Sequence, residues 1–202
     1  MKKLFRKLLG IGLAVALAFG IMAAPVVKSG YKLYKQAVTA VPLSQKVDEI
    51  RMSDGYTPLK EISPVFIEQL LESEDRRFYS HFAIDPISLF RAVVTNITRG
   101  GYVQGGSTIT QQLAKNMYFS FEKQMSRKIA ELFVAWDLEK NYSKDEILAM
   151  YCALAYFGQN CYGVKRACGY YYGIEPIDID DHKAQQLVRT LKAPSVYNPS
   201  TM

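Results

Sequence analysis

The sequence predicts a mainly α-helical protein, with one N-terminal transmembrane helix followed by one helical domain. Residues 8–27 contain twenty apolar or small residues and no charge, which is enough to cross a bilayer as a helix. From residue 63 onward, apolar residues recur at helical spacing between capping and breaking residues, and no run alternates as a half-buried strand would. The 202 residues are enough to bury a sizeable core.

The N-terminal segment also predicts on which side of a membrane the domain lies. Four basic residues precede the apolar run: Lys2, Lys3, Arg6 and Lys7. Basic residues favour the cytoplasmic side, so we expect the rest of the chain to be exported. A cleaved signal peptide is the alternative, although its apolar region usually has about 7 to 15 residues. We expect a basic cluster and anchor over residues 1–28, a stalk over 29–62 and the domain over 63–202.

The net charge of +6 does not indicate a nucleic-acid-binding surface. Four of the 25 basic residues lie in the N-terminal cluster, and the remaining 21 face 19 acidic residues, which leaves a balance of only +2. Three cysteines, Cys152, Cys161 and Cys168, are an odd number for an exported domain. We expect them to be small buried hydrophobic residues, with a bridge between Cys161 and Cys168 as the alternative.

Capping and breaking residues divide the domain into six expected helices. Ser63-Pro64 begins the first, because serine caps helices and proline fits the first turn. Asp85-Pro86 begins the second, which carries apolar residues at helical spacing and ends at Gly100-Gly101. Ser107 follows the glycine-rich stretch RGGYVQGG and is the expected cap of the third, over residues 107–119.

The three remaining helices include the one expected at the centre of the domain. The fourth, from about Phe121 to Asn141, has apolar residues on two sides, which is typical of a central helix. One face carries Met125, Ile129, Leu132, Phe133 and Trp136, and the other carries Val134, Ala135 and Leu138. Ser143 and Glu146 form a capping box for the fifth, which ends at Gly158. The sixth spans Asp181 to Lys192.

Glu74 stands where helical spacing calls for an apolar side chain. The apolar stripe around it consists of Ile67, Leu70, Leu71 and Phe78. A carboxylate on such a face is either paired or used in chemistry. The alternative is a solvated carboxylate that pairs with Arg76 or Arg77.

Residues 105–116, GGSTITQQLAKN, indicate an anion-binding helix start. A glycine-rich turn that opens a helix presents free N–H groups to an anionic oxygen. Helical spacing then places Thr108, Gln111, Gln112 and Lys115 on one side. A polar exposed face is the alternative. The stretch lacks the Gly-Lys-Ser/Thr of a nucleotide-binding P-loop.

Glu131 is the second carboxylate with apolar neighbours on an expected central helix. An ordinary ion pair with Arg127, four residues earlier, is the alternative reading. Two carboxylates in different surroundings suit acid/base chemistry. Lys115, Arg127 and Lys128 would suit a leaving phosphate. Two histidines in all are too few for a histidine-rich zinc site.

Five ordered motifs between about residues 60 and 200 resemble one known family. They are Glu74-Asp75-x-x-Phe78-x-x-His81; residues 106–116, GSTITQQLAKN; residues 127–131, RKIAE; the set Lys144, Ile147, Tyr151, Phe157 and Gly158; and Ala193-Pro194 with Tyr197-Asn198-Pro199. In order and spacing they resemble the peptidoglycan glycosyltransferases of family 51. This family includes the monofunctional transglycosylases and the glycosyltransferase domain of class A penicillin-binding proteins.

The resemblance implies a lysozyme-like helical fold and an inverting, lipid II-polymerising glycosyltransferase. The glycan chain would pass from undecaprenyl pyrophosphate to the 4-hydroxyl of lipid II. Glu74 would be the general base, and Glu131 would assist departure of the pyrophosphate, directly or through a divalent cation. The resemblance assigns substrate and pyrophosphate binding to Ser107, Thr108, Gln111, Gln112, Lys115, Asn116, Arg127 and Lys128, and support of the first motif to Asp75, Phe78 and His81.

The same resemblance implies a cellular setting. We expect a single-pass protein of a bacterial plasma membrane, with the catalytic domain on the outer side and lipid II, the growing glycan and the bilayer as partners. Other cell-wall synthesis proteins are expected partners, and nucleic acid is not. No tightly bound cofactor is expected, apart from a divalent cation such as Mg²⁺ or Mn²⁺. Because little chain follows Pro199, we expect a monofunctional enzyme without a transpeptidase domain.

Three departures from the family pattern keep two other functions open. Ala83 replaces a usual glycine, Cys152-Ala153 replaces Leu-Asn, and Lys183 stands where an acidic residue is common. None removes a catalytic group, but they suggest repacking in the C-terminal half. A catalytically silent, membrane-anchored lipid II binder or scaffold is therefore one alternative. A lytic muramidase, which also uses a carboxylate on such a fold, is the other.

Overall fold

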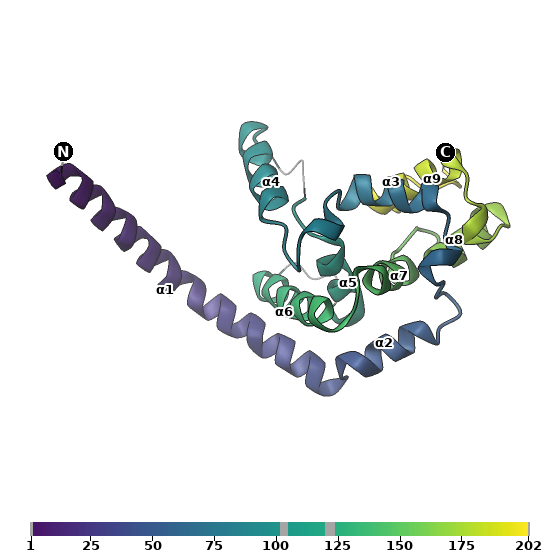
Figure 1. Ribbon diagram of the computed structural model, residues 1–202, viewed down its shortest axis with the longest axis horizontal. Helices are drawn as coiled ribbons and strands as arrows, with labels where there is room; N and C mark the ends of the chain where they lie inside the picture. Colours follow the sequence, from purple (N-terminus) through teal and green to yellow (C-terminus); the bar gives the residue numbers. More distant parts are fainter. Residues whose placement is uncertain (1, 102–104, 120–123, 202) are drawn as a thin grey trace.

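The computed structural model describes residues 2–101, 105–119 and 124–201, with side chains from residue 20 onward in these ranges. Within them the fold consists of α-helices and short 3₁₀ helices (Figure 1). The one β-bridge there is an isolated pair, Tyr156 with Tyr162. The prediction of a mainly α-helical fold is confirmed.

The helices follow one another with short connections. Their bounds are α1 Lys2–Ala40, α2 Leu43–Arg51, α3 Pro64–Glu74, α4 Pro86–Thr98, α5 Ile109–Tyr118, α6 Met125–Asn141, α7 Lys144–Leu154, α8 Val164–Tyr172 and α9 Asp181–Lys192, with 3₁₀ turns η1 Leu59–Glu61, η2 Phe78–Ser80 and η3 Pro176–Asp178. The expected bounds of the sixth helix, now α9, are confirmed.

Helix α1 extends away from the domain and packs against α6 near its C-terminal end (Figure 1). The approach is close, because a Cβ atom on Gly30 would lie 2.5 Å from the Ile129 Cβ atom. Tyr34 Oη donates to Asp137 Oδ2 at 2.5 Å. The Tyr34 ring also lies 5.4 Å from the Phe133 ring. The expected stalk therefore contains the end of α1, and this end is fixed to the domain.

The predicted membrane anchor is not tested by the structure. Among the residues with described side chains, no helix has the length and apolar content that a membrane crossing needs. The basic cluster and residues 8–19 of the predicted anchor lie outside those residues. The anchor therefore stays a prediction.

The hydrophobic core surrounds α5, which packs against both α6 and α7. Ile109 and Leu113 of α5 are fully buried, as is Leu138 of α6. Helix α3 packs against α9, the last helix of the chain (Figure 1). The core therefore holds α5 between its neighbours and leaves the N-terminal end of α5 beside the end of α3.

Two caps differ from the expectation. Ser63 occupies the N-cap of α3, but its Oγ donates to the Ile179 carbonyl at 2.7 Å and caps nothing. Helix α5 is capped by Thr108, whose Oγ1 accepts from Gln111 N at 3.2 Å. Ser107, the expected cap, lies one residue too early, and its Oγ accepts from Lys128 instead. The predicted position of Ser63 is therefore confirmed without its capping bond, whereas the predicted cap of α5 moves from Ser107 to Thr108; in both cases a tertiary partner takes the serine hydroxyl.

Two helix ends also differ. Helix α3 ends at Glu74, so Phe78 lies in the turn η2 rather than on the same helix. Helix α7 has the predicted capping box but ends at Leu154, short of Gly158. The predicted start of the fourth helix, at residues 121–123, lies outside the described residues. Two helices, α2 and α8, are not predicted by the sequence analysis.

The buried face of α6 is the second of the two expected faces. Val134, Ala135 and Leu138 are fully buried. On the first face, Met125 and Trp136 are exposed, at 70% and 56%. The other members of that face lie toward α1 or are half-buried. The sequence could not separate these faces, because both are apolar.

The cysteines lie within the core, whereas the apolar residues of α4 do not. The three cysteines are buried and unpaired, as expected, and burial raises the pKa of both Cys152 and Cys168 to about 12. Helix α4 instead leaves its apolar residues exposed: Ile87, Leu89, Phe90, Val93, Val94 and Ile97. Among the described elements, no helix pairs extensively with α4.

Candidate active site

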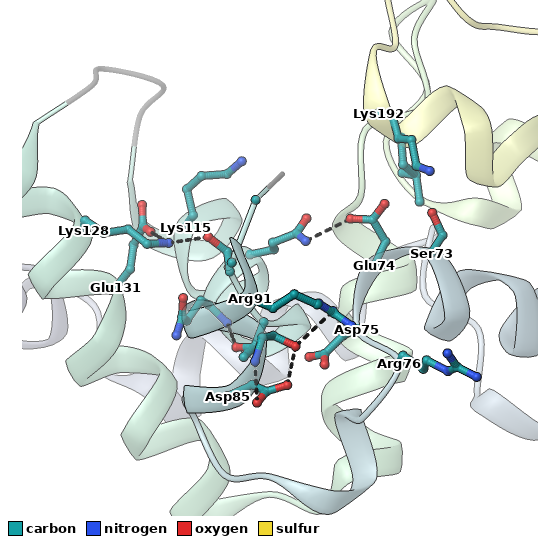
Figure 2. Close-up of a pocket in the computed structure, with 18 of the residues that line it drawn as sticks. Ser73, Glu74, Asp75, Arg76, Asp85, Arg91, Lys115, Lys128, Glu131 and Lys192 are labelled. Carbon is teal, nitrogen blue, oxygen red and sulfur yellow. Dashed lines mark hydrogen bonds and ion pairs between the residues drawn. The ribbon is translucent and has the colours of Figure 1, made fainter. Parts of the chain in front are cut away.

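A cleft of about 960 Å³ lies where the end of α3, the start of α5, α6 and the end of α9 come together. Both candidate carboxylates, Glu74 and Glu131, line it. Figure 2 shows Glu74 near Lys192 at one end of the view, and Glu131 with Lys128 at the other. The fold therefore brings together three of the sequence motifs, which come from α3, α5 and α6.

Glu74 is half-buried at the last position of α3. Its Oε2 atom accepts a hydrogen bond of 3.0 Å from Gln112 Nε2, and Gln112 Oε1 accepts one of 3.3 Å from Tyr151 Oη. Arg76, the expected alternative partner, pairs with Glu72 at 3.0 Å. Arg77 pairs with Asp85. The Glu74 carboxylate is therefore held by a neutral amide and faces the cleft (Figure 2).

Asp75 connects the first motif to the start of α5. Its Oδ1 lies 2.8 Å from His81 Nε2, and its Oδ2 accepts from Ile109 N at 3.0 Å. The His81 Nδ1 atom bonds the Phe82 carbonyl. Although burial of His81 opposes its charged form, the bonds to Asp75 and Phe82 raise the pKa of His81. Asp75 and His81 are thus structural parts of the site, which fits the supporting role expected of them.

Asp85 is a fully buried carboxylate that caps α4. It accepts from Ile87 N at 3.0 Å, and from Ser88 N at 3.1 Å and Ser88 Oγ at 2.6 Å. It also pairs with Arg77. Burial opposes its charged form, but the bonds from Ser88 and Arg77 prevail and lower the pKa of Asp85 to about 2.

Glu131 is almost completely buried, with 1% of its surface exposed. Its Oε2 lies 2.9 Å from Lys128 Nζ, and its Oε1 lies 3.2 Å from Arg127 Nε. Lys128 Nζ also donates to Ser107 Oγ at 2.9 Å. Burial lowers the pKa of Lys115; Glu131 opposes this change and the two neighbouring cations add to it. Three cations and one carboxylate thus make a site with positive charge in excess, suited to a phosphate.

The expected divalent cation does not fit this arrangement. Mg²⁺ and Mn²⁺ need several oxygen ligands, whereas Glu131 supplies one carboxylate that already faces two cations. In the described part of the chain, the one converging set of ligand types is Asp75, His81 and Asp85. The atoms of that set are engaged by the hydrogen bonds given above. We therefore derive no step through a metal ion.

Thr108 and Gln111 line the cleft, whereas Asn116, another predicted binding residue, does not. The side chains of Thr108 and Gln111 both donate to the Ala83 carbonyl, at 3.0 and 3.1 Å, so their polar groups fix α5 to the preceding loop. The contacts of Thr108, Gln111 and Asn116 with substrate stay untested predictions. Phe78, expected to support the first motif, is buried, and Lys144 Nζ lies 4.3 Å from the centre of its ring.

Three cations that line the cleft are absent from the sequence prediction. Arg76 and Arg91 come from the first motif and α4, and Lys192 comes from the end of α9 (Figure 2). Lys192 is separated from Glu74 by more than a hundred residues of sequence. Its placement depends on the packing of α9 against α3, which no local pattern encodes. Arg76 could have been predicted to line the cleft, because it lies two residues after Glu74 in the sequence.

The departures from the family pattern lie outside the cleft. Lys183 pairs with Asp180 at the start of α9, and Ala153 is buried. Neither lines the cleft. Ala83 is buried as well, and its carbonyl is the acceptor for Thr108 and Gln111.

Comparisons with known proteins agree with these features. Residues 42–202 match the family described as Transglycosylase. The chain belongs to this family. This confirms the resemblance that the motifs indicate. It also confirms the expectation that the chain is an enzyme of the peptidoglycan glycosyltransferase family.

Several curated relatives resemble the chain over most of its length. Penicillin-binding protein 1F of Bacillus subtilis is 44% identical over 141 residues, which are 70% of this chain and 20% of that protein. Penicillin-binding protein 1A of Aquifex aeolicus is 34% identical over 98% of this chain and 29% of that protein. Penicillin-binding protein 1A/1B of Bacillus subtilis is 39% identical over 71% of this chain and 16% of that protein. The chain spans less than a third of each relative.

Proposed function

We propose that this chain polymerises the glycan strands of peptidoglycan. The glycan chain is transferred from undecaprenyl pyrophosphate to the 4-hydroxyl of lipid II, with inversion at the reacting carbon. The observation that carries the proposal is the division of one cleft between Glu74, held by a neutral amide, and Glu131, paired with cations. One region suits proton transfer, and the other suits a leaving phosphate.

In this proposal Glu74 is the general base. It removes the proton from the acceptor hydroxyl while the oxygen attacks the donor sugar. Among the described residues, Gln112 is the group that hydrogen-bonds the Glu74 carboxylate, through Oε2. The Oε1 atom is therefore available to the acceptor hydroxyl. General-base catalysis of this kind typically contributes ~10²- to 10⁴-fold to a rate.

The cation cluster, defined as Lys115, Arg127 and Lys128, neutralises the pyrophosphate as it leaves. Its positive charge stabilises the negative charge that develops on the departing pyrophosphate. Such stabilisation is especially effective in a partly desolvated site. Glu131 holds Arg127 and Lys128 in position from the buried side. Ser107 accepts from Lys128 and fixes the direction of its ammonium group.

The proposal includes a membrane setting, because the substrate carries a lipid. Residues 8–27 would anchor the chain, with the domain on the outer side of a bacterial plasma membrane. The exposed apolar residues of α4 support this setting, since exposed apolar residues that gather on one helix mark contact sites for proteins or membranes. Helix α4 also supplies Ser88 and Arg91 to the cleft.

The test is incubation of the detergent-held protein with labelled lipid II, with the products resolved by size. We expect a ladder of glycan strands. Bound lipid II without polymer would favour the silent binder. Shortening of preformed glycan strands without polymerisation would favour the muramidase.

A further inference from the structure

A chain of two hydrogen bonds connects the interior of the domain to Glu74. Tyr151 of α7 donates from Oη to Gln112 Oε1 on α5 at 3.3 Å, and Gln112 Nε2 donates to Glu74 Oε2 of α3 at 3.0 Å. Tyr151 is 2% exposed. A buried tyrosine hydroxyl requires a partner, and among the described residues Gln112 is the one that it bonds.

The orientation of the Gln112 amide decides whether its NH₂ group or its oxygen faces the Glu74 carboxylate. Turning the amide by half a rotation would place its oxygen against the Glu74 carboxylate, with acceptor facing acceptor. A hydroxyl donor at Oε1 opposes that rotation. Burial of Tyr151, together with the charge of Glu74, holds the pKa of Tyr151 well above its usual value of 10. The hydroxyl therefore keeps its proton and remains a donor throughout the working pH range.

The surroundings of Tyr151 leave it little else to bond. Its neighbours Leu148 and Cys152 on α7 are buried. Burial also raises the pKa of Cys152 to about 12, so that residue stays a neutral thiol. The ring packs in the hydrophobic core, and within the described part of the chain the acceptor of its hydroxyl is Gln112 Oε1.

We propose that Tyr151 is a positioning residue for the reaction: it fixes the Gln112 amide so that the amide donates to Glu74 and leaves Glu74 Oε1 directed at the acceptor hydroxyl. This inference rests on the proposed function, in which Glu74 is the base. Tyr151 does not line the cleft and acts only through Gln112.

The test is a double-mutant cycle on lipid II polymerisation. Tyr151→Phe removes only the hydroxyl, so we expect kcat to fall roughly tenfold, the equivalent of one hydrogen bond, with KM within about twofold. Gln112→Met keeps the volume of the side chain but cannot donate, and it should lower kcat at least as much. Because both act on one contact, the double variant should be no slower than Gln112→Met alone.

The chain offers a matched control. Tyr172 Oη donates to Gln186 Oε1 at 2.8 Å, which is the same kind of pair between α8 and α9. Neither residue lines the cleft. Tyr172→Phe should therefore leave kcat and KM unchanged. Melting temperatures of all variants separate loss of folded protein from loss of turnover.

The outcomes separate this inference from the proposed function. If the wild type polymerises and Tyr151→Phe retains its kcat, the positioning role is wrong while the proposed function stands. Effects of Tyr151→Phe and Gln112→Met that multiply in the double variant would also overturn it. If Gln112→Met retains the wild-type kcat, Tyr151 has nothing to position. A wild type that forms no polymer would overturn the proposed function, and this inference with it.

Discussion

The cleft contains two glutamates in opposite surroundings. Glu74, at the end of α3, is half-buried and accepts one hydrogen bond from a neutral amide. Glu131, within α6, is 1% exposed and lies within 3.2 Å of two cations. Both glutamates stand among apolar residues in the sequence, so the sequence pattern does not distinguish them. Their partners in the folded protein do. In the proposed function the first carboxylate is the base, while the second holds Arg127 and Lys128 in position.

Truncation of the two glutamates should affect stability very differently. Glu131→Ala leaves Arg127 and Lys128 without their shared partner, which should cost about 3 kcal/mol of the free energy of unfolding. Glu74→Ala removes one half-exposed hydrogen bond and should cost about 1 kcal/mol or less. Denaturant unfolding of both variants measures the difference. Equal losses would mean that the two environments are not as distinct as the contacts indicate.

Removal of Asp75, which connects the first motif to the start of α5, should have the next largest effect on stability. Asp75→Ala leaves Ile109 N–H and His81 without their buried acceptor, which should cost about 2 kcal/mol. Asp145→Ala is the control, because Asp145 is exposed and, in the described ranges, its carboxylate accepts a hydrogen bond from Tyr79 across the surface. That control should change stability by less than about 0.5 kcal/mol. Similar melting temperatures for the two variants would remove Asp75 from this role.

Lys115→Ala should weaken binding of the pyrophosphate donor by roughly tenfold, about the value of one charge-assisted contact. Lys140→Ala, which removes an exposed lysine outside the cleft at the end of α6, should leave binding unchanged. Donor affinity can be measured with a non-reactive lipid pyrophosphate. If the Lys115→Ala variant binds the donor as tightly as the wild type, the leaving group is held elsewhere.

The smallest expected effect is a pH dependence of stability from His81. Its pKa in the folded protein is raised above 6.5, so the folded state holds the proton more tightly than the unfolded chain does. The stabilisation is therefore complete below pH 6.5 and is lost as the pH rises through the folded-state pKa. Thermal unfolding between about pH 5.5 and 8.5 should show this loss in the wild type. A His81→Gln variant with the same slope would assign the dependence to another group.

Much of the fold follows from local sequence signals. The bounds of α9, the capping box Ser143 with Glu146, and the Asp85 cap of α4 are all predictable, because capping depends on residues within one turn. Helix α8 is not, since GVKRACGYYY contains two glycines and no capping side chain at its start. Its buried Val164, Ala167 and Cys168 fit the core only once the other helices are in place.

The site is predictable as a set of motifs but not as an arrangement. Glu74 and Glu131 stand out because each is a carboxylate among apolar residues. The approach of Lys192 depends on the packing of α9 against α3, and the donor to Glu74 depends on Tyr151 from α7. Both are long-range contacts that leave no local pattern. Ser107 and Thr108 are equally good caps by type, and only the reach of Lys128 to Ser107 distinguishes them.

The most direct test of the division between the two glutamates is Glu74→Gln beside the wild type, with lipid II polymerisation and lipid II binding measured on the same preparations. The substitution keeps the size of the side chain and removes its ability to accept a proton. We predict that polymer formation falls by ~10² or more, while lipid II binding stays within about twofold. Polymerisation near the wild-type rate would contradict the assignment of the base to Glu74.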